Sequence, residues 1–172
     1  MSGLWRITAR VMAAKDGALE ETAGFGQAVT AVASVVMSAR ESFCLCSVSL
    51  PERIFDARPV IRAARDFACK NPRTMARLLV IEPRRVTSRL HPFIEMCQLF
   101  PDSFSVRTLA ERVQVPAEDF LLNDQGQGIC FPLPGRSRFF LPDGHIRSRL
   151  ETVFGELWHH AVPAVELRRL LL

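Results

Sequence analysis

The segment AEDFLLNDQGQGICFPLP at residues 117–134 carries acidic side chains beside apolar runs that are typical of strands. Carboxylates near a turn can act as acid–base groups or bind a cation. Glu118, Asp119 and Asp124 would need further oxygen ligands to hold a metal ion, and the sequence offers none nearby. Solvated charges at a strand edge would instead discourage edge-to-edge pairing. We therefore predict no metal site and no cofactor.

Three arginines follow two predicted strands directly. Arg53 comes after the first, and Arg84 and Arg85 come after the second. Ligands of open α/β sheets bind outside the carboxyl ends of the strands, and guanidinium groups match phosphate and carboxylate geometry. The pattern predicts an anion-binding rim formed by Arg53, Arg84 and Arg85. The alternative is a solvated loop in an arginine-rich chain.

The positions of the histidines favour structural roles over catalysis or metal binding. His91 precedes Pro92 at a predicted helix start, which favours a packing or capping role. His159 and His160 are neighbours near a predicted helix end, where they point in different directions and cannot hold one metal ion together. The chain contains no G-x-S-x-G element, no P-loop and no dinucleotide fingerprint. We predict no catalytic residue.

The elements that would position these residues follow from hydrophobic periodicity. Helical spacing begins at Phe25 and recurs from Val60 and Leu90, and apolar strand patterns occupy residues 43–50, 77–82 and 104–109. This α-β-α-β-α-β order predicts crossover connections. Short strands with turn residues between them follow at DFLLN, GICF and RFFL. A helix over residues 146–158 with Asp143 as its cap and a short helix after Pro163 close the chain.

Together these elements predict a mixed, largely parallel α/β sheet with helices on both faces, C-terminal antiparallel hairpin strands and a closing helix. Residues 25–172 are expected to form a single domain, and residues 1–24 a flexible N-terminal tail. The length of 172 residues, 48% of them hydrophobic, suits one core.

Charge, cysteine content and hydropathy indicate the kind of partner, the compartment and whether a membrane span is present. The net charge of +4 mildly favours anionic partners. The five cysteines form no CxxC pair and lie among apolar residues, so we expect buried free thiols, a reducing compartment and cytoplasmic localisation. The longest weakly polar run, at residues 28–39, is too short for a spanning helix, which needs about twenty apolar residues.

Four stretches together resemble an uncharacterised bacterial family with a single phospholipase D-like domain. These stretches are SVSLPERIFDARPVIRAARDFA, RLLVIEPRRV, EDFLLNDQGQGICFPLP and LETVFGELWHHAVPAVELRRL. The resemblance covers residues 26–170 and implies the phospholipase D-like fold. It also implies, as a possible partner, an acetyltransferase encoded nearby, although no stretch of this chain resembles that module.

Active phospholipase D-like enzymes carry a His-x-Lys-x-x-x-x-Asp motif, in which histidine attacks phosphorus and lysine neutralises charge. Aligning Asp124 with the motif's aspartate places Ala117 at the histidine position and Asp119 at the lysine position. Residues 92–144 contain no histidine and residues 71–172 no lysine, so no other register restores the motif. The resemblance implies a degenerate domain, a pseudoenzyme.

Three hypotheses follow. The first is a non-catalytic phospholipase D-like domain that acts as an interaction or regulatory module with a protein partner. The second is a weak binder of nucleic acid or of a phosphate-bearing ligand through Arg53, Arg84 and Arg85. The third is a hydrolase with unrecognised chemistry, and it ranks last because no nucleophile, base and orienting group can be assembled.

Overall fold

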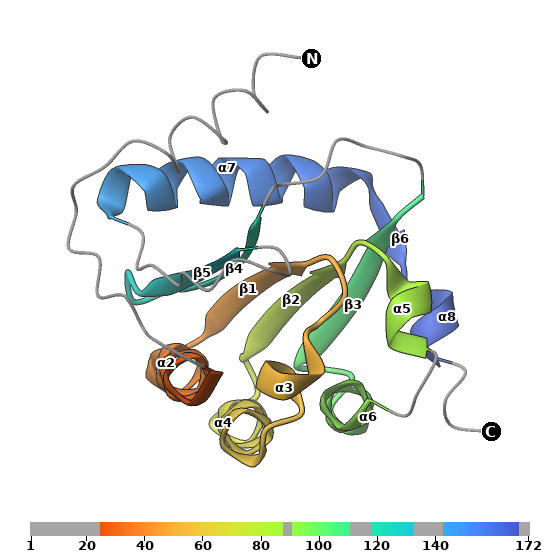
Figure 1. Cartoon of the computed structure of the whole chain (residues 1–172), viewed down its shortest axis with the longest axis horizontal. Coiled ribbons are helices and arrows are strands. Elements are labelled where there is room, and N and C mark those ends of the chain that lie inside the picture. Colours follow the sequence, from red (N-terminus) through yellow and green to blue (C-terminus); the bar gives the residue numbers. More distant parts are fainter. Residues whose placement is uncertain (1–24, 88–90, 111–117, 133–142, 169–172) are drawn as a thin grey trace.

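The computed structural model describes residues 25–87, 91–110, 118–132 and 143–168, which form one mixed sheet with helices on both sides (Figure 1). The strands lie in the order β5-β4-β1-β2-β3-β6. The elements in chain order are α2 (Phe25–Ser38), β1 (Ser42–Ser47), α3 (Glu52–Phe55), α4 (Arg58–Ala68), β2 (Met75–Val80), α5 (Pro83–Thr87), α6 (Pro92–Leu99), β3 (Phe104–Leu109), β4 (Glu118–Asn123), β5 (Gly128–Pro132), α7 (Gly144–His160), β6 (Ala161–Pro163) and α8 (Val165–Arg168).

The expectation of a largely parallel sheet is wrong. Within the described part of the chain, the β1–β2 and β2–β3 pairs are parallel, whereas the β1–β4, β4–β5 and β3–β6 pairs are antiparallel. The three crossover strands occupy the middle, and later strands return antiparallel at both edges. The strand β6 was not predicted, because Ala161–Pro163 is too short to show an alternating pattern.

Helices cover both faces, as expected, but unequally. Each β-α-β crossover is right-handed by rule, and β1, β2 and β3 follow one another in one direction, so their helices are placed on the same face. Helices α2, α4 and α6 lie there side by side, and α7 alone crosses the other face (Figure 1). The larger core lies on the three-helix side, and a smaller core lies under α7.

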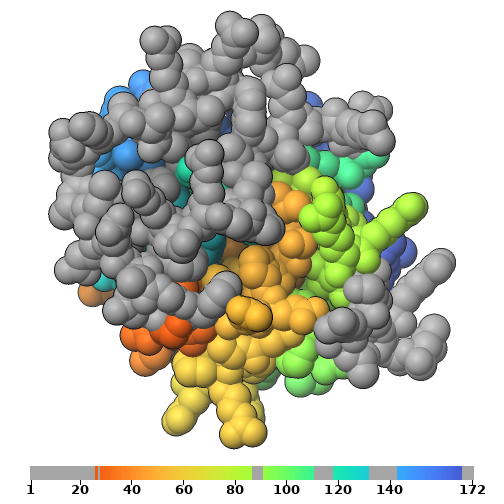
Figure 2. Space-filling model, in the orientation of Figure 1, coloured from red at the N-terminus to blue at the C-terminus, as the bar shows by residue number. Residues whose placement is uncertain are grey.

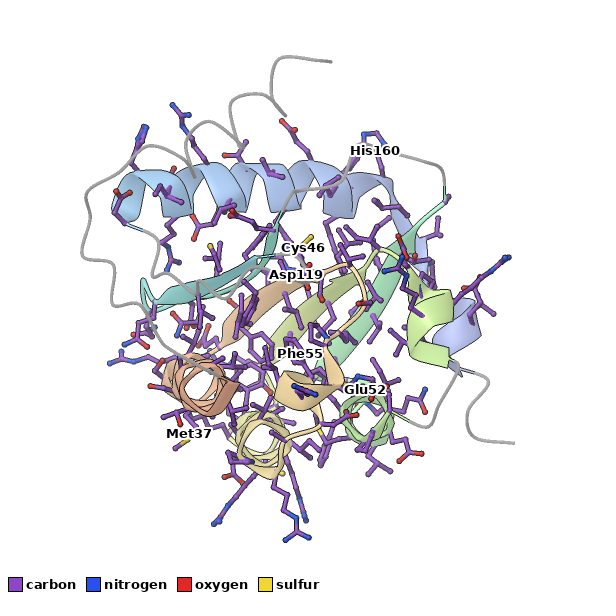
Figure 3. All side chains as sticks on the ribbon, viewed as in Figure 1. Met37, Cys46, Glu52, Phe55, Asp119 and His160 are labelled. Carbon is purple, nitrogen blue, oxygen red and sulfur yellow. The ribbon has the colours of Figure 1, made fainter. Side chains whose placement is uncertain are left out.

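The register explains which side chains enter which core. Cys44 and Cys46 of β1 lie opposite Leu122 and Phe120 of β4, and all four belong to the core under α7. Their neighbours in each strand point to the three-helix side, because successive side chains of a strand alternate between faces. Figure 3 shows Phe55 between α3 and the sheet, and Met37 on the outer side of α2.

Local signals for α7 and for α4 are confirmed. The Asp143 side chain accepts hydrogen bonds from the backbone N–H of His145 and Ile146, at 2.9 and 2.8 Å, and so caps α7. The outer residues Arg58, Arg62 and Arg65 of α4 are exposed. In Figure 2 the yellow segment that contains α4 projects side chains into solvent at the lower edge.

The cysteine prediction holds for four residues and fails for one. Cys44, Cys46, Cys97 and Cys130 are buried free thiols, whereas Cys69 is free and exposed. Cys69 is the residue directly after α4 and forms its C-terminal cap. The expected tail at residues 1–24 and the expected strand RFFL at 138–141 lie outside the described residues. Among the described residues, no helix has both the length and the hydropathy to cross a membrane.

Candidate functional site

The carboxyl end of β1 holds a buried polar network centred on Asp119 of β4. Its side chain is 7% exposed. One carboxylate oxygen accepts a hydrogen bond from the hydroxyl of Ser47, and the other accepts one from the backbone N–H of Val48 at 2.8 Å. Figure 3 places Asp119 near Cys46 of β1, and because Phe120 faces α7, the side chain of Asp119 points to the three-helix side of the sheet. Asp119 therefore fastens the last residue of β1 and the loop that follows it.

The network continues through Leu50, whose backbone adopts a φ of 48°. This left-handed conformation is costly for a residue with a side chain. The loop is held by several contacts: the N–H of Leu50 donates to the oxygen of Ser47 at 3.0 Å, and its carbonyl lies 3.1 Å from Nε2 of His91. The Leu50 side chain is itself 1% exposed, in the core on the three-helix side. Surrounding contacts thus enforce the strained turn.

His91 joins this loop to Asp56. Its side chain is 2% exposed, and Nδ1 lies 2.7 Å from Oδ1 of Asp56. Both groups that face the imidazole, the Leu50 carbonyl and the Asp56 carboxylate, are hydrogen-bond acceptors. The predicted helix-start position is confirmed, because His91 is the residue before α6, but its side chain makes no capping hydrogen bond.

These residues are the types found in a Ser-His-Asp triad, but they are not arranged as one. Ser47 is hydrogen-bonded to Asp119 and Leu50, whereas His91 is hydrogen-bonded to Leu50 and forms a close ion-pair contact with Asp56. A triad needs the histidine in hydrogen-bond contact with the serine it activates. Here a backbone peptide stands between the two side chains. The arrangement fixes a loop, and it does not prepare a nucleophile.

The acidic groups of the network have altered proton affinities. Burial raises the pKa of Asp119 to about 6, although the hydrogen bonds from Ser47 and Val48 act in the opposite direction. Burial likewise raises the pKa of Asp56, and the charge of His91 opposes that rise. Both carboxyl groups therefore hold a proton more readily than they would in water.

Asp124 lies at the opposite end of β1 from Asp119. Its carboxylate accepts hydrogen bonds from the backbone N–H groups of Arg40, Glu41 and Ser42, at 2.9, 2.7 and 3.1 Å. Partial burial acts to raise the pKa of Asp124, but these hydrogen bonds outweigh it and lower the pKa. Because Asp119 and Asp124 stand at opposite ends of one strand, they share no site. Ala117 lies outside the described residues.

The turn that follows β4 is built to anchor the chain. Gly126 has a φ of 82°, which a glycine adopts without strain. The Asn123 side chain accepts hydrogen bonds from the N–H groups of Gln125 and Gln127, at 2.9 and 3.0 Å. It also donates to the carbonyl of Val35 near the end of α2, at 2.8 Å. This hairpin therefore holds α2 and β1 together.

The arginines proposed as an anion-binding rim lie on two short helices. Arg53 is on α3, and Arg84 and Arg85 are on α5; all three are exposed. These helices follow β1 and β2, whose last residues pair in parallel register, so the arginines stand at the same edge of the sheet. Arg85 forms an ion pair with Glu82. This edge also contains the Asp119 network.

Sequence reasoning missed Ser47 and Asp56 and assigned no contact to Asp119. Ser47 carried one signal: it ends an apolar strand at a position that faces the core, so it needed a polar partner. Its partner comes from β4, far along the chain. Among the described residues, no group of three or more metal-ligating side chains is close enough to hold a metal ion.

Comparisons with known proteins give a family and a fold. A family model described as a domain of unknown function (DUF7931) matches residues 25–170. No protein with a curated function matches the chain in sequence. The solved structures that match over most of its length include two of known description. One is TrmBL2, an archaeal chromatin protein described as showing a novel mode of DNA binding, at 13% identity and a TM-score of 0.57 over 95% of this chain. The other is NucT from Helicobacter pylori, at 14% identity and a TM-score of 0.57 over 81% of this chain.

The two structural likenesses differ in extent. The match takes in 92% of the NucT chain but 61% of the TrmBL2 chain, so this chain spans less than two thirds of TrmBL2. At such identities the likenesses show the fold alone. The match to NucT supports a phospholipase D-like fold, as the sequence resemblance implied.

Proposed function

The chain belongs to the DUF7931 family, and we propose that it is a non-catalytic phospholipase D-like module that binds a partner and leaves phosphodiester bonds intact. One observation carries this proposal. Asp119, which aligns with the lysine of the catalytic motif, uses both carboxylate oxygens to hold Ser47 and Val48. The position that would stabilise a phosphoryl group is thus occupied by a buried acid that serves the fold.

The electrostatics of this position support the proposal. Phosphoryl transfer requires cations or oriented donors directed at the developing negative charge. The Asp119 carboxyl would repel a phosphodiester when ionised, and its nearest donors are already engaged. Ser47, fully buried, is engaged with Asp119 and Leu50 and is not presented to a substrate.

A turnover assay tests the absence of catalysis. The purified chain is incubated with bis(p-nitrophenyl) phosphate and with a labelled oligonucleotide, with and without divalent metal ions. We expect no product above a buffer control. Turnover that disappears in Ser47→Ala or Asp119→Asn, while circular dichroism shows that the variant is folded, would overturn the proposal.

A second candidate function is nucleic-acid binding through Arg53, Arg84 and Arg85. It is favoured by their exposed positions on α3 and α5, which follow adjacent parallel strands. Guanidinium groups at the carboxyl edge of a sheet suit phosphate groups. The fold likeness to TrmBL2, described as an archaeal chromatin protein that binds DNA, is compatible with this function.

Salt dependence tests this second function. Each phosphate contact to a DNA duplex contributes about 0.9 to the slope of log affinity against log salt. The triple variant with alanine at Arg53, Arg84 and Arg85 should lower that slope by about 2 to 3. Alanine at the exposed α4 residues Arg58, Arg62 and Arg65 is the matched control, since it removes the same charge elsewhere. An equal effect of both triple variants would contradict a site at the carboxyl edge.

A further inference from the structure

The single helix α7 leaves part of its sheet face open in the described structure. Along β2 the residues that point toward α7 change from exposed to buried: Met75 is 45% exposed, Arg77 is exposed and Leu79 is fully buried. The alternate residues, which face the three-helix side, are buried throughout. A helix is about 10 Å wide and crosses strands about 20 Å long. Among the described residues it therefore leaves the amino half of this face of β2 exposed, whereas Ser105, Arg107 and Leu109 on the same face of β3 are half-buried along the whole strand.

Two arginines stand at the boundary of this open area. Arg77 of β2 lies opposite Ser105 of β3, and Arg107 lies opposite Leu79, so both arginines point to the α7 face from neighbouring parallel strands. Arg77 and Arg107 are diagonal neighbours in the sheet, with Cα atoms about 8 Å apart. At that spacing both guanidinium groups can reach one anionic chain.

Aromatic residues of α7 hold both guanidinium groups in place. The guanidinium carbon of Arg77 lies 5.6 Å from the Phe154 ring centroid, and that of Arg107 lies 4.5 Å from the Trp158 ring centroid. The two rings stack on each other at 5.5 Å with an interplanar angle of 19°. A guanidinium that stacks on a ring keeps its in-plane N–H donors available for an acceptor. Less side-chain entropy is then lost when a ligand binds.

These donors have no acceptor within residues 25–87, 91–110, 118–132 and 143–168. The side chains of Arg77 and Arg107 make no hydrogen bond and no ion pair there. Arg77 contacts the Phe154 ring and acts electrostatically on the neighbouring Cys44, and Arg107 contacts the Trp158 ring. Arg147 at the start of α7 shows the contrast, because it pairs with Glu151 at 2.6 Å and donates to the carbonyls of Asn123 and Gln127. Two prepositioned cations therefore stand on an open sheet surface without a counter-charge from the described chain.

We propose that this surface, formed by Met75, Arg77, Ser105, Arg107 and Trp158, binds a single strand of nucleic acid. The guanidinium groups would contact successive phosphates, and the hydroxyl of Ser105 adds a donor between the two strands. The exposed Met75 offers an apolar surface for a base, and the half-buried Trp158 supports Arg107 from below. A sheet surface beneath a crossing helix cannot enter a duplex groove, but an unpaired strand can lie across it.

This site is independent of the carboxyl-edge arginines. Arg53, Arg84 and Arg85 follow the ends of β1 and β2, whereas Arg77 lies near the start of β2 on the α7 face. The proposal also does not depend on the absence of catalysis at Asp119. Either function can fail while the other stands.

The test measures binding of a fluorescein-labelled oligothymidylate to the full chain across a salt series. We expect measurable affinity at low salt, and about a tenfold loss in the double variant Arg77→Gln/Arg107→Gln. The salt slope should fall by about 1.4, since each contact to a single strand contributes about 0.7. The double variant Arg62→Gln/Arg65→Gln removes two exposed charges from α4 on the opposite side of the sheet and should change affinity less than twofold.

Three results would overturn the proposal: no binding at low salt, equal losses in both double variants, or equal and equally arginine-dependent binding of an acidic polyglutamate peptide. A second measurement leaves Arg77 and Arg107 unchanged. Trp5 and Trp158 are the only tryptophans, so a Trp5→Phe background reports on Trp158 alone. Oligothymidylate should quench its emission with the same affinity, and unchanged emission on binding would reject Trp158 as part of the site.

Discussion

The carboxyl end of β1 and the open part of the α7 face differ in whether their charged side chains have partners within the chain. At the carboxyl end, Asp119 has a protein partner for each oxygen, and His91 contacts acceptors at both ring nitrogens. On the α7 face, Arg77 and Arg107 are held by aromatic rings, and within the described residues their donors have no acceptor. The polar side chains of the first region are mostly paired with one another, whereas the arginine donors of the second remain available to the ligand that we propose.

This difference indicates what each region does. Buried polar groups that are fully paired stabilise one conformation, here the strained turn at Leu50. Cations that are already held in place and have no counter-charge can bind an anion with a smaller loss of side-chain entropy. Removing a side chain should therefore reduce stability in the first region and affinity in the second. The predictions below test that separation, from the largest expected effect to the smallest.

Asp119→Ala should cost about 3 kcal/mol of unfolding free energy. It leaves the N–H of Val48 and the hydroxyl of Ser47 without their acceptor in a buried place, and each unsatisfied group costs about 1–3 kcal/mol. Urea denaturation followed by circular dichroism measures the loss. Asp102→Ala, which removes an exposed carboxylate from a turn, should change stability by less than about 0.5 kcal/mol. Equal losses of unfolding free energy in the two variants would contradict a structural role for Asp119.

The pH dependence of stability should change in Asp119→Asn. Burial raises the pKa of Asp119 to about 6 in the folded chain, against about 3.9 in an unfolded one. The folded state therefore binds the extra proton between these values. The resulting stabilisation is complete below about pH 4 and is lost as the pH rises through 6, to a total of about 2 to 3 kcal/mol.

Asparagine at this position cannot ionise, so the difference in unfolding free energy between wild type and Asp119→Asn should follow that curve. Denaturation at several pH values measures it, and taking the difference cancels the contributions of Asp56 and Asp124. A difference that does not vary with pH would show that Asp119 does not titrate in this range.

Substituting lysine at both arginine positions of the α7 face distinguishes the contribution of positive charge to affinity from that of stacking on the aromatic rings. Arg77→Lys/Arg107→Lys keeps two positive charges but loses the planar groups that lie on Phe154 and Trp158. We expect oligothymidylate affinity to fall about threefold, an effect between wild type and the glutamine variant, with the salt slope nearly unchanged. Affinity as low as that of the glutamine variant would contradict a phosphate-binding role for the charge itself.

The last prediction concerns the reactivity of two thiols. It tests whether solvent reaches the buried residues next to the open area. Cys69 is exposed and should react with Ellman's reagent in the folded protein. Cys44 lies opposite Arg77 on the α7 face, where burial raises the pKa of its thiol to about 12, so it should not react until the chain unfolds. Mass spectrometry of the modified peptides distinguishes the two. Early reaction of Cys44 would show that the opening beside Arg77 is deeper than described.

The sequence predicted the elements of the fold better than the site. The stripe of α2 and the apolar strand β2 were predicted from residue spacing, and the Asp143 cap and the hairpin β4–β5 from the residue types that begin helices and form turns. Asp119 was read as a motif position or a solvated edge charge, and the structure places it in a buried hydrogen-bond network. Arg77 and Arg107 carried no signal, because each lies within a strand pattern where an arginine reads as a solvent-facing residue.

The sequence by itself determined where helices and strands form, which face of each is apolar, and the absence of a His-x-Lys motif, because these are properties of neighbouring residues. Tertiary structure alone decided that β4 pairs antiparallel with β1 and β6 with β3, that Asp119 meets Ser47, and that Arg77 and Arg107 stack on α7. Each of these depends on pairing between residues far apart in the chain, which register and packing select. The local periodicity of a sequence does not indicate which distant residue will lie opposite a given residue.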